Sequence, residues 1–310
     1  MRIGRGGRLA AAVTMTTFDD FDAWADTVSG ASLRLACDGV ERRRWTLGRV
    51  DLGSVVLQVA TEGGGNLCYG GNEHPGTTLF VPLTDAAAHV ANGERLDDDS
   101  LLAIPRGADF RIHVRRRAHA WCSVALPGDM LSTASSTRVV CGAAAVSRLR
   151  RLVTAAVESL REQAGGTAAH RAAAREVIAA AAACLHVPPE RSVSIGRPRL
   201  ERADIVRRAM AAIEAGPAVP TAADLAQEVG VTSRTLLRTF QESFGVPPKR
   251  FLMLRELHKV RRSLVTGCAH EQAVATVLVR HGIWEFGRFA ARYRRQFGEL
   301  PSQTLRRCRA

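Results

Sequence analysis

The chain has 310 residues, of which 46% are hydrophobic and 24% charged, a composition that indicates folded globular domains and excludes an intrinsically disordered chain. No run of 18 apolar residues occurs, so no membrane-spanning helix is predicted. The formal net charge is +13, and residues 197–310 hold 21 of the 43 Lys and Arg residues but only 10 of the 30 Asp and Glu residues, so a polyanionic partner is expected for the last third of the chain.

The first 30 residues are predicted to be an extension that precedes the first folded domain. Basic residues and a short apolar run occur there, but threonines interrupt the run and no small-residue cleavage site follows it, so a secretory signal is not expected. Met15 is an alternative start to Met1. The seven cysteines are scattered without a Cys-x-x-Cys pair, which favours reduced thiols and a cytoplasmic protein.

Residues 31–128 have the pattern of β structure. Phe110, Ile112 and Val114 alternate with Arg111 and His113, which is the period of two expected for a strand. Glycine-rich turns separate several short runs of this kind. Short strands with turns at regular intervals predict a β-sandwich or a small β-barrel.

From residue 146 the apolar residues recur at helical spacing, and two helices are expected over residues 146–186, with a break at Gly165-Gly166. Residues 31–190 are therefore assigned to one unit, whose helices pack on the β region or on a second copy of it. Residues 191–200 contain Pro, Ser and Gly and are predicted to form a linker. Residues 201–310 are predicted to be an all-α domain, which makes the fold class α+β.

A repeat links two parts of this last domain. Phe244-Gly245 and Phe297-Gly298 each begin a Phe-Gly-x-x-Pro sequence, and the two sequences are 53 residues apart. The same offset pairs Phe240 with Tyr293. Two copies of one supersecondary unit explain this spacing, and a long helix that begins at Pro248 is predicted to join them.

The first copy has the signals of a helix-turn-helix. Thr221 can cap a short helix, Gly230 can end that helix in a left-handed turn, and Thr232 can cap a second helix. Leu236 and Phe240 supply the buried stripe of the second helix. A helix, a short glycine turn and a capped second helix together make a helix-turn-helix.

The second helix of this unit leaves Ser233, Arg234, Thr235 and Arg238 off its buried stripe. Arg234 and Arg238 are one helical turn apart on one face. In a major groove, arginine can pair with O6 and N7 of guanine. These four residues are the predicted DNA-binding residues of the first unit.

A specific set of positions recurs across residues 215–306: Leu225-Ala226, Phe240, Phe244-Gly245, Arg255-x-Leu257, Gly282, Phe289, Tyr293 and Phe297-Gly298-x-x-Pro301. This set resembles the double helix-turn-helix domain of AraC-type transcription regulators. The resemblance implies that two recognition helices enter successive major grooves of double-stranded DNA, about 34 Å apart. It also implies that the N-terminal unit is a cupin-like β-barrel that senses a small-molecule effector, dimerises, or does both.

By position, the resemblance assigns four DNA-binding residues to the second unit: Phe286, Gly287, Arg288 and Arg292. For Phe286, core packing is favoured over a thymine contact, and the neighbouring Trp284 is expected to pack rather than to contact a ligand. Ala291 stands where the family often has a polar contact residue. Shape and phosphate contacts are therefore expected to contribute more to this half of the interface.

A metal-dependent cupin enzyme is an alternative for the N-terminal unit. Such a site needs closely spaced histidines, typically His-x-His, with a carboxylate, and this spacing does not occur among His74, His89, His113 and His119. The even separation of His113 and His119 would let them share one face of a single strand. Nucleotide-binding and nucleophile motifs are absent, so no enzymatic activity, catalytic residue, metal or cofactor is predicted.

Five aromatic residues of the β region can form either a core or the wall of a ligand pocket: Trp45, Tyr69, Phe80, Phe110 and Trp121. Core packing is the expected role, and no effector-binding residue is assigned.

The sequence therefore predicts a cytoplasmic, sequence-specific DNA-binding transcription regulator, either an activator or a repressor. The expected partners are double-stranded DNA, a second copy of the chain, a small-molecule effector and, for an activator, RNA polymerase, with no membrane. Two alternatives are kept. One is a packaging or RNA-binding protein that grips phosphates alone, and the other is a metal-cupin enzyme with an attached DNA-binding domain.

Overall fold

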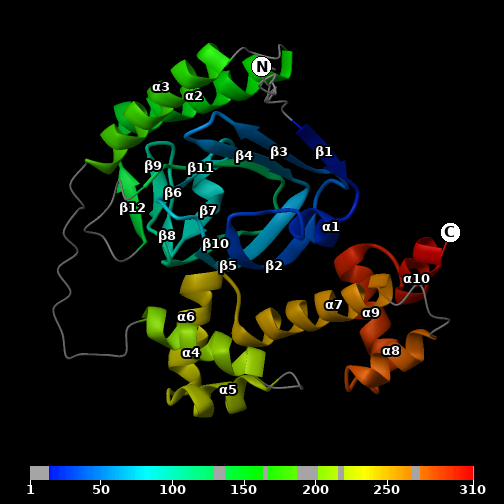
Figure 1. Ribbon diagram of the computed structural model, residues 1–310. Coiled ribbons are helices and arrows are strands. Elements are labelled where there is room, and N and C mark those ends of the chain that lie inside the picture. The colour runs from blue at the N-terminus through cyan, green and yellow to red at the C-terminus, as the bar shows by residue number, and fades with distance from the viewer. Residues whose placement is uncertain are drawn as a thin grey trace, which may run out of the picture.

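The computed structural model describes residues 14–128, 137–162, 167–186, 202–215, 220–266 and 273–309. The expected linker over residues 191–200, the Gly165-Gly166 break and the first 13 residues of the expected extension lie outside these ranges. Within them, a β domain lies between two helices on one side and a helical C-terminal domain on the other (Figure 1). None of the described helices is long and apolar enough to cross a membrane.

The β domain consists of two antiparallel sheets. The larger sheet has the strand order β1-β3-β4-β11-β6-β9-β12, and the smaller sheet has the order β2-β5-β10-β7-β8. The strands of the larger sheet are β1 (Thr14–Phe18), β3 (Trp45–Asp51), β4 (Val56–Glu62), β6 (Thr78–Pro82), β9 (Ser100–Ile104), β11 (His119–Ala125) and β12 (Arg138–Cys141). Those of the smaller sheet are β2 (Ala31–Val40), β5 (Gly64–Asn72), β7 (His89–Ala91), β8 (Glu94–Arg95) and β10 (Asp109–Val114), with the short 3-10 turn η1 (Ala86–Ala88) before β7.

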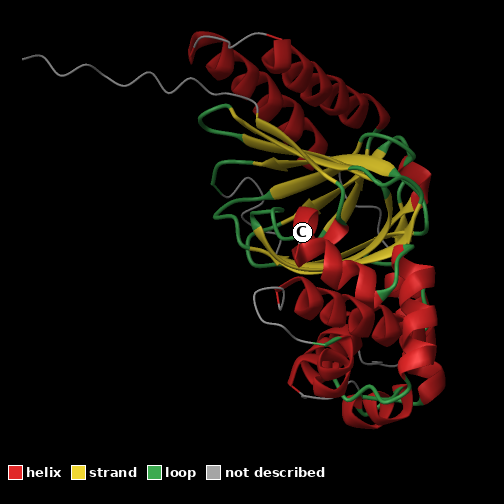
Figure 2. Cartoon of the chain, turned by 90° about the vertical axis from the view of Figure 1, so that its right-hand side faces the viewer, coloured by secondary structure: helices red, strands yellow, loops and turns green. Residues whose placement is uncertain are grey.

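The two sheets face each other across an aromatic core (Figure 2). Trp45, Phe80, Phe110 and Trp121 belong to this core because the strand alternation turns them inward, and Trp24 joins it from the helix that follows β1. Hydrogen bonding ends at separate edge strands in each sheet, so among the described residues the strands stack as two sheets and do not close into one barrel. The predicted α+β class, with a β domain followed by a helical domain, is confirmed in this form.

The helices α2 (Ala143–Glu162) and α3 (Thr167–Leu185) cover the outer face of the larger sheet. Val146, Leu149 and Val153 of α2 share one core cluster with Leu57 and Leu101 of the sheet. Of the two expected arrangements, packing on the β region of the same chain is therefore the one observed.

Two elements occupy the span that was expected to be an extension. β1 pairs with β3 in antiparallel register, and α1 (Phe21–Ala25) follows it. The side chain of Asp20 caps α1 by accepting hydrogen bonds from the amides of Asp22 and Ala23. Trp24 of α1 is fully buried and donates its indole N–H to the Thr46 carbonyl at 3.1 Å. Residues 14–25 are thus integral to the β domain.

The C-terminal domain contains two helical clusters joined by the long helix α7. The helices are α4 (Arg202–Ala215), α5 (Ala222–Val229), α6 (Ser233–Phe244), α7 (Pro248–Thr266), α8 (Val274–Arg280), α9 (Phe286–Phe297) and α10 (Pro301–Arg309). One core forms from α4, α5, α6 and the first half of α7, and a second core forms from the rest of α7 with α8, α9 and α10. The outer face of the smaller sheet rests on α6, α7 and α9. This contact places both helical clusters against one surface of the β domain.

Candidate nucleic-acid interface

The first helix-turn-helix consists of α5 and α6, and its local signals act as the sequence predicted. The hydroxyl of Thr221 accepts the Asp224 amide, and the Asp224 carboxylate accepts the Thr221 amide, which completes a capping box. Gly230 ends α5 at φ 77°, a left-handed conformation that a residue with a side chain rarely adopts. Thr232 then caps α6 by accepting the amide of Thr235 at 3.1 Å.

The second helix-turn-helix consists of α8 and α9 and repeats this design with weaker caps. Gly282, at φ 72°, provides the same left-handed turn. Neither Ala273 before α8 nor Glu285 before α9 makes a side-chain capping hydrogen bond. Phe289 and Tyr293 are fully buried and provide the stripe that corresponds to Leu236 and Phe240. The second unit is therefore held by its core more than by its helix ends.

Both reading helices, α6 and α9, point their C-terminal ends at the β domain. Gly245, which ends α6, lies against the imidazole of His113 in β10. Near the end of α9, Gln296 donates to the Cys37 carbonyl of β2 at 2.7 Å. The first turns of both helices therefore face away from the sheet and are exposed. A surface of this kind is open to a large partner such as duplex DNA.

The four predicted residues of the first unit come together on this exposed end of α6: Ser233, Arg234, Thr235 and Arg238. Arg238 is 72% exposed along its side chain and forms an ion pair with Glu242 at 2.8 Å. Glu242 also pairs with Arg202 of α4 at 3.0 Å. Arg234 has no such carboxylate partner among the described residues. The charge of Arg238 is therefore paired in the free protein, whereas that of Arg234 is not.

The structure divides the four predicted residues of the second unit. Phe286, Gly287 and Arg288 lie in the exposed first turn of α9, and Phe286 is therefore a surface residue rather than a core residue. Arg292 lies a turn further along, half-buried on the side of Glu256 in α7, where burial raises the pKa of Glu256 and the charge of Arg292 opposes that rise. The expectation that Trp284 packs is wrong, because 72% of its surface is exposed.

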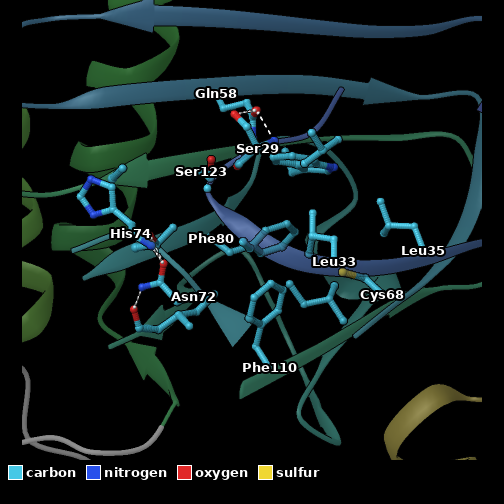
Figure 3. Close-up of a pocket in the computed structure, with 18 of the residues that line it drawn as sticks. Ser29, Leu33, Leu35, Gln58, Cys68, Asn72, His74, Phe80, Phe110 and Ser123 are labelled. Atoms are coloured by element: carbon cyan, nitrogen blue, oxygen red, sulfur yellow. Dashed lines mark hydrogen bonds between the residues drawn. The ribbon is translucent and has the colours of Figure 1, made fainter. Parts of the chain in front are cut away.

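An internal cavity of about 190 Å³ lies between the two sheets of the β domain (Figure 3). Of the five aromatic residues considered from sequence, Phe80, Phe110 and Trp121 line this cavity, while Trp45 is only a core residue and Tyr69 faces the C-terminal domain. Trp24 also lines it. This residue was missed because its segment was assigned to the extension, although Phe21, Trp24 and Ala25 have the i, i+3, i+4 spacing of a packed helix turn.

A buried hydrogen-bonded cluster closes one part of the cavity wall. The Glu62 carboxylate accepts the Trp121 indole N–H at 2.7 Å and the Asn66 amide at 2.6 Å, and His119 lies 3.4 Å away. Burial opposes a charge on His119, but Glu62 outweighs burial and raises the pKa of His119. The remaining amide oxygen of Asn66 is buried without a partner, and the hydroxyl of Ser123 also lines the cavity.

The structure separates the two histidines that were considered from sequence as strand neighbours, His113 and His119. His113 lies in β10 and His119 begins β11, so the expectation that they share one strand is wrong. The chain turns between the two strands at Arg116, which has φ 49°. His119 contacts Glu62, whereas His113 contacts α6. Among the described residues, no group of three His, Cys, Asp or Glu side chains has an arrangement that would hold a metal ion.

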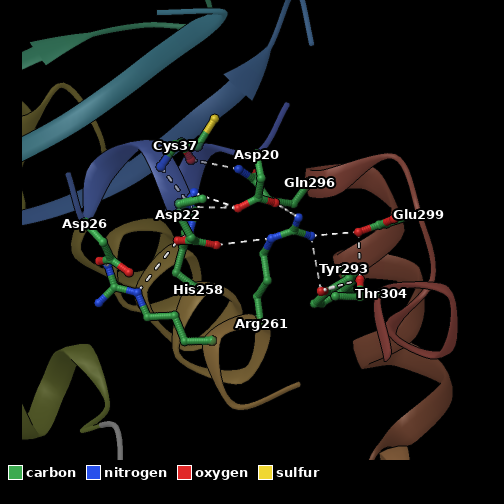
Figure 4. A network of polar contacts seen from close by, with 12 residues as sticks. Asp20, Asp22, Asp26, Cys37, His258, Arg261, Tyr293, Gln296, Glu299 and Thr304 are labelled. Atoms are coloured by element: carbon green, nitrogen blue, oxygen red, sulfur yellow. Dashed lines mark hydrogen bonds and ion pairs between the residues drawn. The ribbon is translucent and has the colours of Figure 1, made fainter. Parts of the chain in front are cut away.

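A second polar network joins the two domains (Figure 4). His258 of α7 donates from Nδ1 to Asp22 of α1 at 2.8 Å and accepts the Cys37 amide at Nε2, at 3.0 Å. Arg261 of α7 pairs with Asp20, with Asp22 at 3.1 Å and with Glu299 at 2.9 Å. Burial opposes a charged Asp22, but His258 and the neighbouring arginines outweigh it and lower the pKa of Asp22. The helix α1 therefore carries Trp24 toward the cavity and Asp22 toward α7.

Comparison with known proteins identifies the C-terminal domain. Residues 225–307 match the family model described as a helix-turn-helix domain. The XylDLEGF operon transcriptional activator of Pseudomonas putida is 35% identical over 85 residues, which cover 27% of this chain and 26% of that protein. The probable thc operon regulatory protein of Rhodococcus erythropolis is 38% identical over 103 residues, which cover 33% of this chain and 31% of that protein.

A solved structure of a probable AraC family transcriptional regulator from Rhodopseudomonas palustris is 33% identical, covers 34% of this chain and 99% of that chain, and superposes with a TM-score of 0.31. The chain thus spans only about a quarter to a third of the length of these curated relatives. Two helix-turn-helix units on one long helix define a DNA-binding domain of double helix-turn-helix type. Residues 225–307 of this chain form such a helix-turn-helix domain, and they are similar to regulators that include a probable AraC family member.

Proposed function

We propose that this protein is a sequence-specific transcription regulator that reads two successive major grooves with α6 and α9. The observation that carries the proposal is the parallel exposure of the first turns of both reading helices, in the part of the chain where the positive charge is concentrated. Direct reading of bases by Arg234 and Arg238 would discriminate by about 1–3 kcal/mol for each well-paired guanine. The DNA-binding residues proposed for this surface are Ser233, Arg234, Thr235, Arg238, Phe286, Gly287 and Arg288, with Arg292 nearer to a phosphate.

Selection of duplexes from a random pool by the full-length chain, repeated across a salt series, tests this function. We expect a site with two short blocks about one helical turn of DNA apart, as the two reading helices require. Arg234→Ala should relax the sequence preference of one block and leave the other unchanged. Enrichment of no sequence, together with a steep loss of binding as salt rises, would instead support the alternative of a protein that binds phosphates alone.

We further propose that the cavity between the sheets binds a small, mainly apolar effector that carries one hydrogen-bond donor. Its support is the aromatic lining, with few polar groups in the wall, among them Asn66, whose amide oxygen has no partner, and Ser123. The helix α1 offers a route from the cavity to the DNA-binding domain, since Trp24 lines the cavity and Asp22 contacts α7. A ligand that displaces Trp24 would favour one arrangement of the two domains only if it binds the two arrangements unequally.

Phenol and toluene are suitable probes of this cavity, because they have similar size and only phenol can donate a hydrogen bond. We expect phenol to bind the wild-type protein more tightly than toluene, and Ser123→Phe, which fills the cavity, to abolish binding of both probes. Calorimetric titration measures this directly. Equal binding of the two probes would show that Asn66 does not select the ligand, and binding unaffected by Ser123→Phe would place the site elsewhere.

A second copy of the chain and, for an activator, RNA polymerase complete the proposed set of partners. The P. putida relative is named as an activator, which supports activation as the proposed mode. Sedimentation of the full-length chain with and without the selected duplex would report the number of copies on one site.

A further inference from the structure

The second reading helix presents an aromatic surface where the first presents polar groups. Trp284 and Phe286 flank Glu285, the residue before α9, and are 72% and 40% exposed. No other large apolar side chain of the described residues is as exposed as Trp284. Because a tryptophan is normally buried to a large extent, this exposure needs a physical reason.

Trp284 is not an incomplete part of the core. Ile283 beside it is buried at 6%, and Phe289 and Tyr293 complete the inner face of α9 with no exposed surface. Neither Trp284 nor Phe286 makes an aromatic contact in the part of the chain that the structure describes. The core of the second unit is therefore already filled, and both rings are available to a partner.

The internal repeat shows how the second unit departs from the first. The Val231 amide donates to the Ala226 carbonyl and the Ile283 amide to the Leu278 carbonyl, so Ile283 corresponds to Val231 and Trp284 is the extra residue of the longer second turn. At the offset of 53 residues, Phe286 corresponds to Ser233 and Gly287 to Arg234. A Cβ atom added at Gly287 would meet nothing within 4 Å, so the space above the first turn of α9 is open. The first unit thus presents a hydroxyl and a guanidinium at the positions where the second presents an aromatic ring and bare backbone.

Charge around the rings favours DNA as their partner. Arg288 lies one residue beyond Gly287 with 79% of its side chain exposed and pairs with Glu285 at 2.7 Å, and Arg280 ends α8 on the other side of the turn. Apolar side chains between two exposed arginines suit the major groove, where the 5-methyl group of thymine lies between two rows of phosphates.

We propose that Trp284 and Phe286 recognise thymine methyl groups, so that α9 reads an A·T-containing block while α6 reads a guanine-containing block through Arg234 and Arg238. The inference rests on the proposed function and adds the base chemistry of each half of the site. Trp284 thereby becomes a specificity-determining residue of the second unit. No position in the first unit carries an equivalent ring, so the two blocks differ in composition.

Replacing thymine with deoxyuridine in the selected duplex tests this inference, since the exchange removes only the 5-methyl group. One buried methyl group is worth about 0.8 kcal/mol, so the wild-type protein should lose about fourfold in affinity for each contacted methyl. The loss should be confined to the block read by α9. Trp284→Ala should bind equally well to duplexes with thymine or deoxyuridine at the position that Trp284 contacts, to within about the experimental error. Phe286→Ala should do the same at the position that Phe286 contacts.

Val40→Ala is the matched control, because Val40 is also 40% exposed but lies in β2, outside the exposed first turns of the reading helices. It should respond to deoxyuridine as the wild type does. Equal melting temperatures of all variants would verify that they fold, which the exposure of Trp284 makes the expected result.

Three outcomes separate this inference from the function on which it rests. Failure to select any site would overturn the proposed function. A two-block site whose binding is indifferent to deoxyuridine would leave the function intact and overturn the role of the rings. Unchanged DNA binding by Trp284→Ala combined with lost transcription would also overturn it, and would assign the aromatic surface to a protein partner.

Discussion

At the scale of single residues, Arg238 enters the proposed interface already paired. Its guanidinium lies 2.8 Å from Glu242, and this carboxylate also holds Arg202. To grip a base, Arg238 must release Glu242, which also repels phosphates. We expect Glu242→Gln to raise the affinity for the selected duplex by about threefold and to steepen its salt dependence. Fluorescence anisotropy across a salt series measures both, and the gain should vanish in the double variant with Arg238→Ala.

Gly287 is a position where helix stability and DNA binding are expected to favour different residues. Alanine in an exposed helix position stabilises by about 0.5–1 kcal/mol relative to glycine, and the added Cβ at this position meets no atom of the protein. We therefore expect Gly287→Ala to raise the melting temperature slightly and yet to weaken DNA binding, because the methyl group would occupy space needed by a base edge. If the variant is more stable and binds DNA with unchanged affinity, Gly287 is not part of the interface.

The exposed arginines of α6 could be predicted from sequence, whereas Trp284 could not. Arg234 and Arg238 were identifiable because Leu236 and Phe240 fix which face of the helix is buried, and the arginines fall outside it. Ile283 and Trp284 are adjacent and both apolar, and only the packed core decides which of them is inside. Sequence pattern favours burial of the larger ring, and the structure buries the smaller side chain instead.

At the scale of elements, α8 is a short helix of seven residues whose N-terminus lacks a side-chain cap, unlike α5 in the first unit. Ala273 already has the extended backbone of a capping residue, with φ −76° and ψ 148°. We expect Ala273→Ser to stabilise α8 by about 1 kcal/mol, since a serine hydroxyl there can accept a free amide of the first turn. Hydrogen exchange of the α8 amides measures the gain.

Thr221→Ala provides the opposite change in the first unit and should weaken α5 by a similar amount, since it removes the capping box. Exchange at α8 that is unchanged by Ala273→Ser would mean that the core around Val277 and Leu278, rather than the helix end, limits opening of the second unit.

The repeat made the helices of the last domain predictable, because each copy supports the other. The β domain was predictable in class but not in arrangement. Period-two patterns reveal strands, but they carry no information on whether the sheets close into a barrel, and hydrogen bonding at the edge strands determines that. The segment 14–25 is hard to predict because its strand and its helix have five residues each, and the one i, i+3, i+4 set of α1 is not repeated along the chain.

At the scale of the whole molecule, the contact between the domains joins residues that are far apart in sequence. His258 of α7 contacts Asp22 and Cys37, which are more than 200 residues away, and Arg250 contacts the buried Asp38 at 2.6 Å. Taken one at a time in the sequence, the charged residues among them indicate only a solvated surface. Only the fold brings them together, so neither this contact nor the route from the cavity through α1 could be inferred from spacing.

We expect His113 to make this contact between the domains sensitive to pH. The ring lies in β10 against Gly245 at the end of α6, where an added Cβ would collide with it. Burial lowers the pKa of His113 to about 4, while interaction with the Ser243 backbone and Asp38 opposes the shift and Arg115 and Arg95 reinforce it. The docked arrangement therefore favours the neutral ring.

The sign of the effect follows from this lowered pKa. An undocked His113 would titrate near its ordinary pKa of about 6.5 and so bind more protons than the docked form below that pH. Docking should be strongest above pH 6.5 and weaken by up to about 1.4 kcal/mol for each pH unit between 6.5 and 4. Asp22 affects docking at lower pH than His113 does, because its lowered pKa means that the carboxylate becomes protonated only below the pH at which an ordinary aspartate does.

Hydrogen exchange of the last turn of α6, measured between pH 7 and pH 5 and corrected for the intrinsic rate, tests this expectation. Protection should fall with pH in the wild type and stay nearly constant in His113→Gln, whose amide can still donate to the Ser243 carbonyl but does not titrate. His89 also has a pKa lowered by burial, to about 3, but it lies inside the β domain beside Phe80 and cannot substitute for His113 at α6. Equal acid sensitivity of the wild type and His113→Gln would therefore show that protonation of His113 is not what weakens this contact.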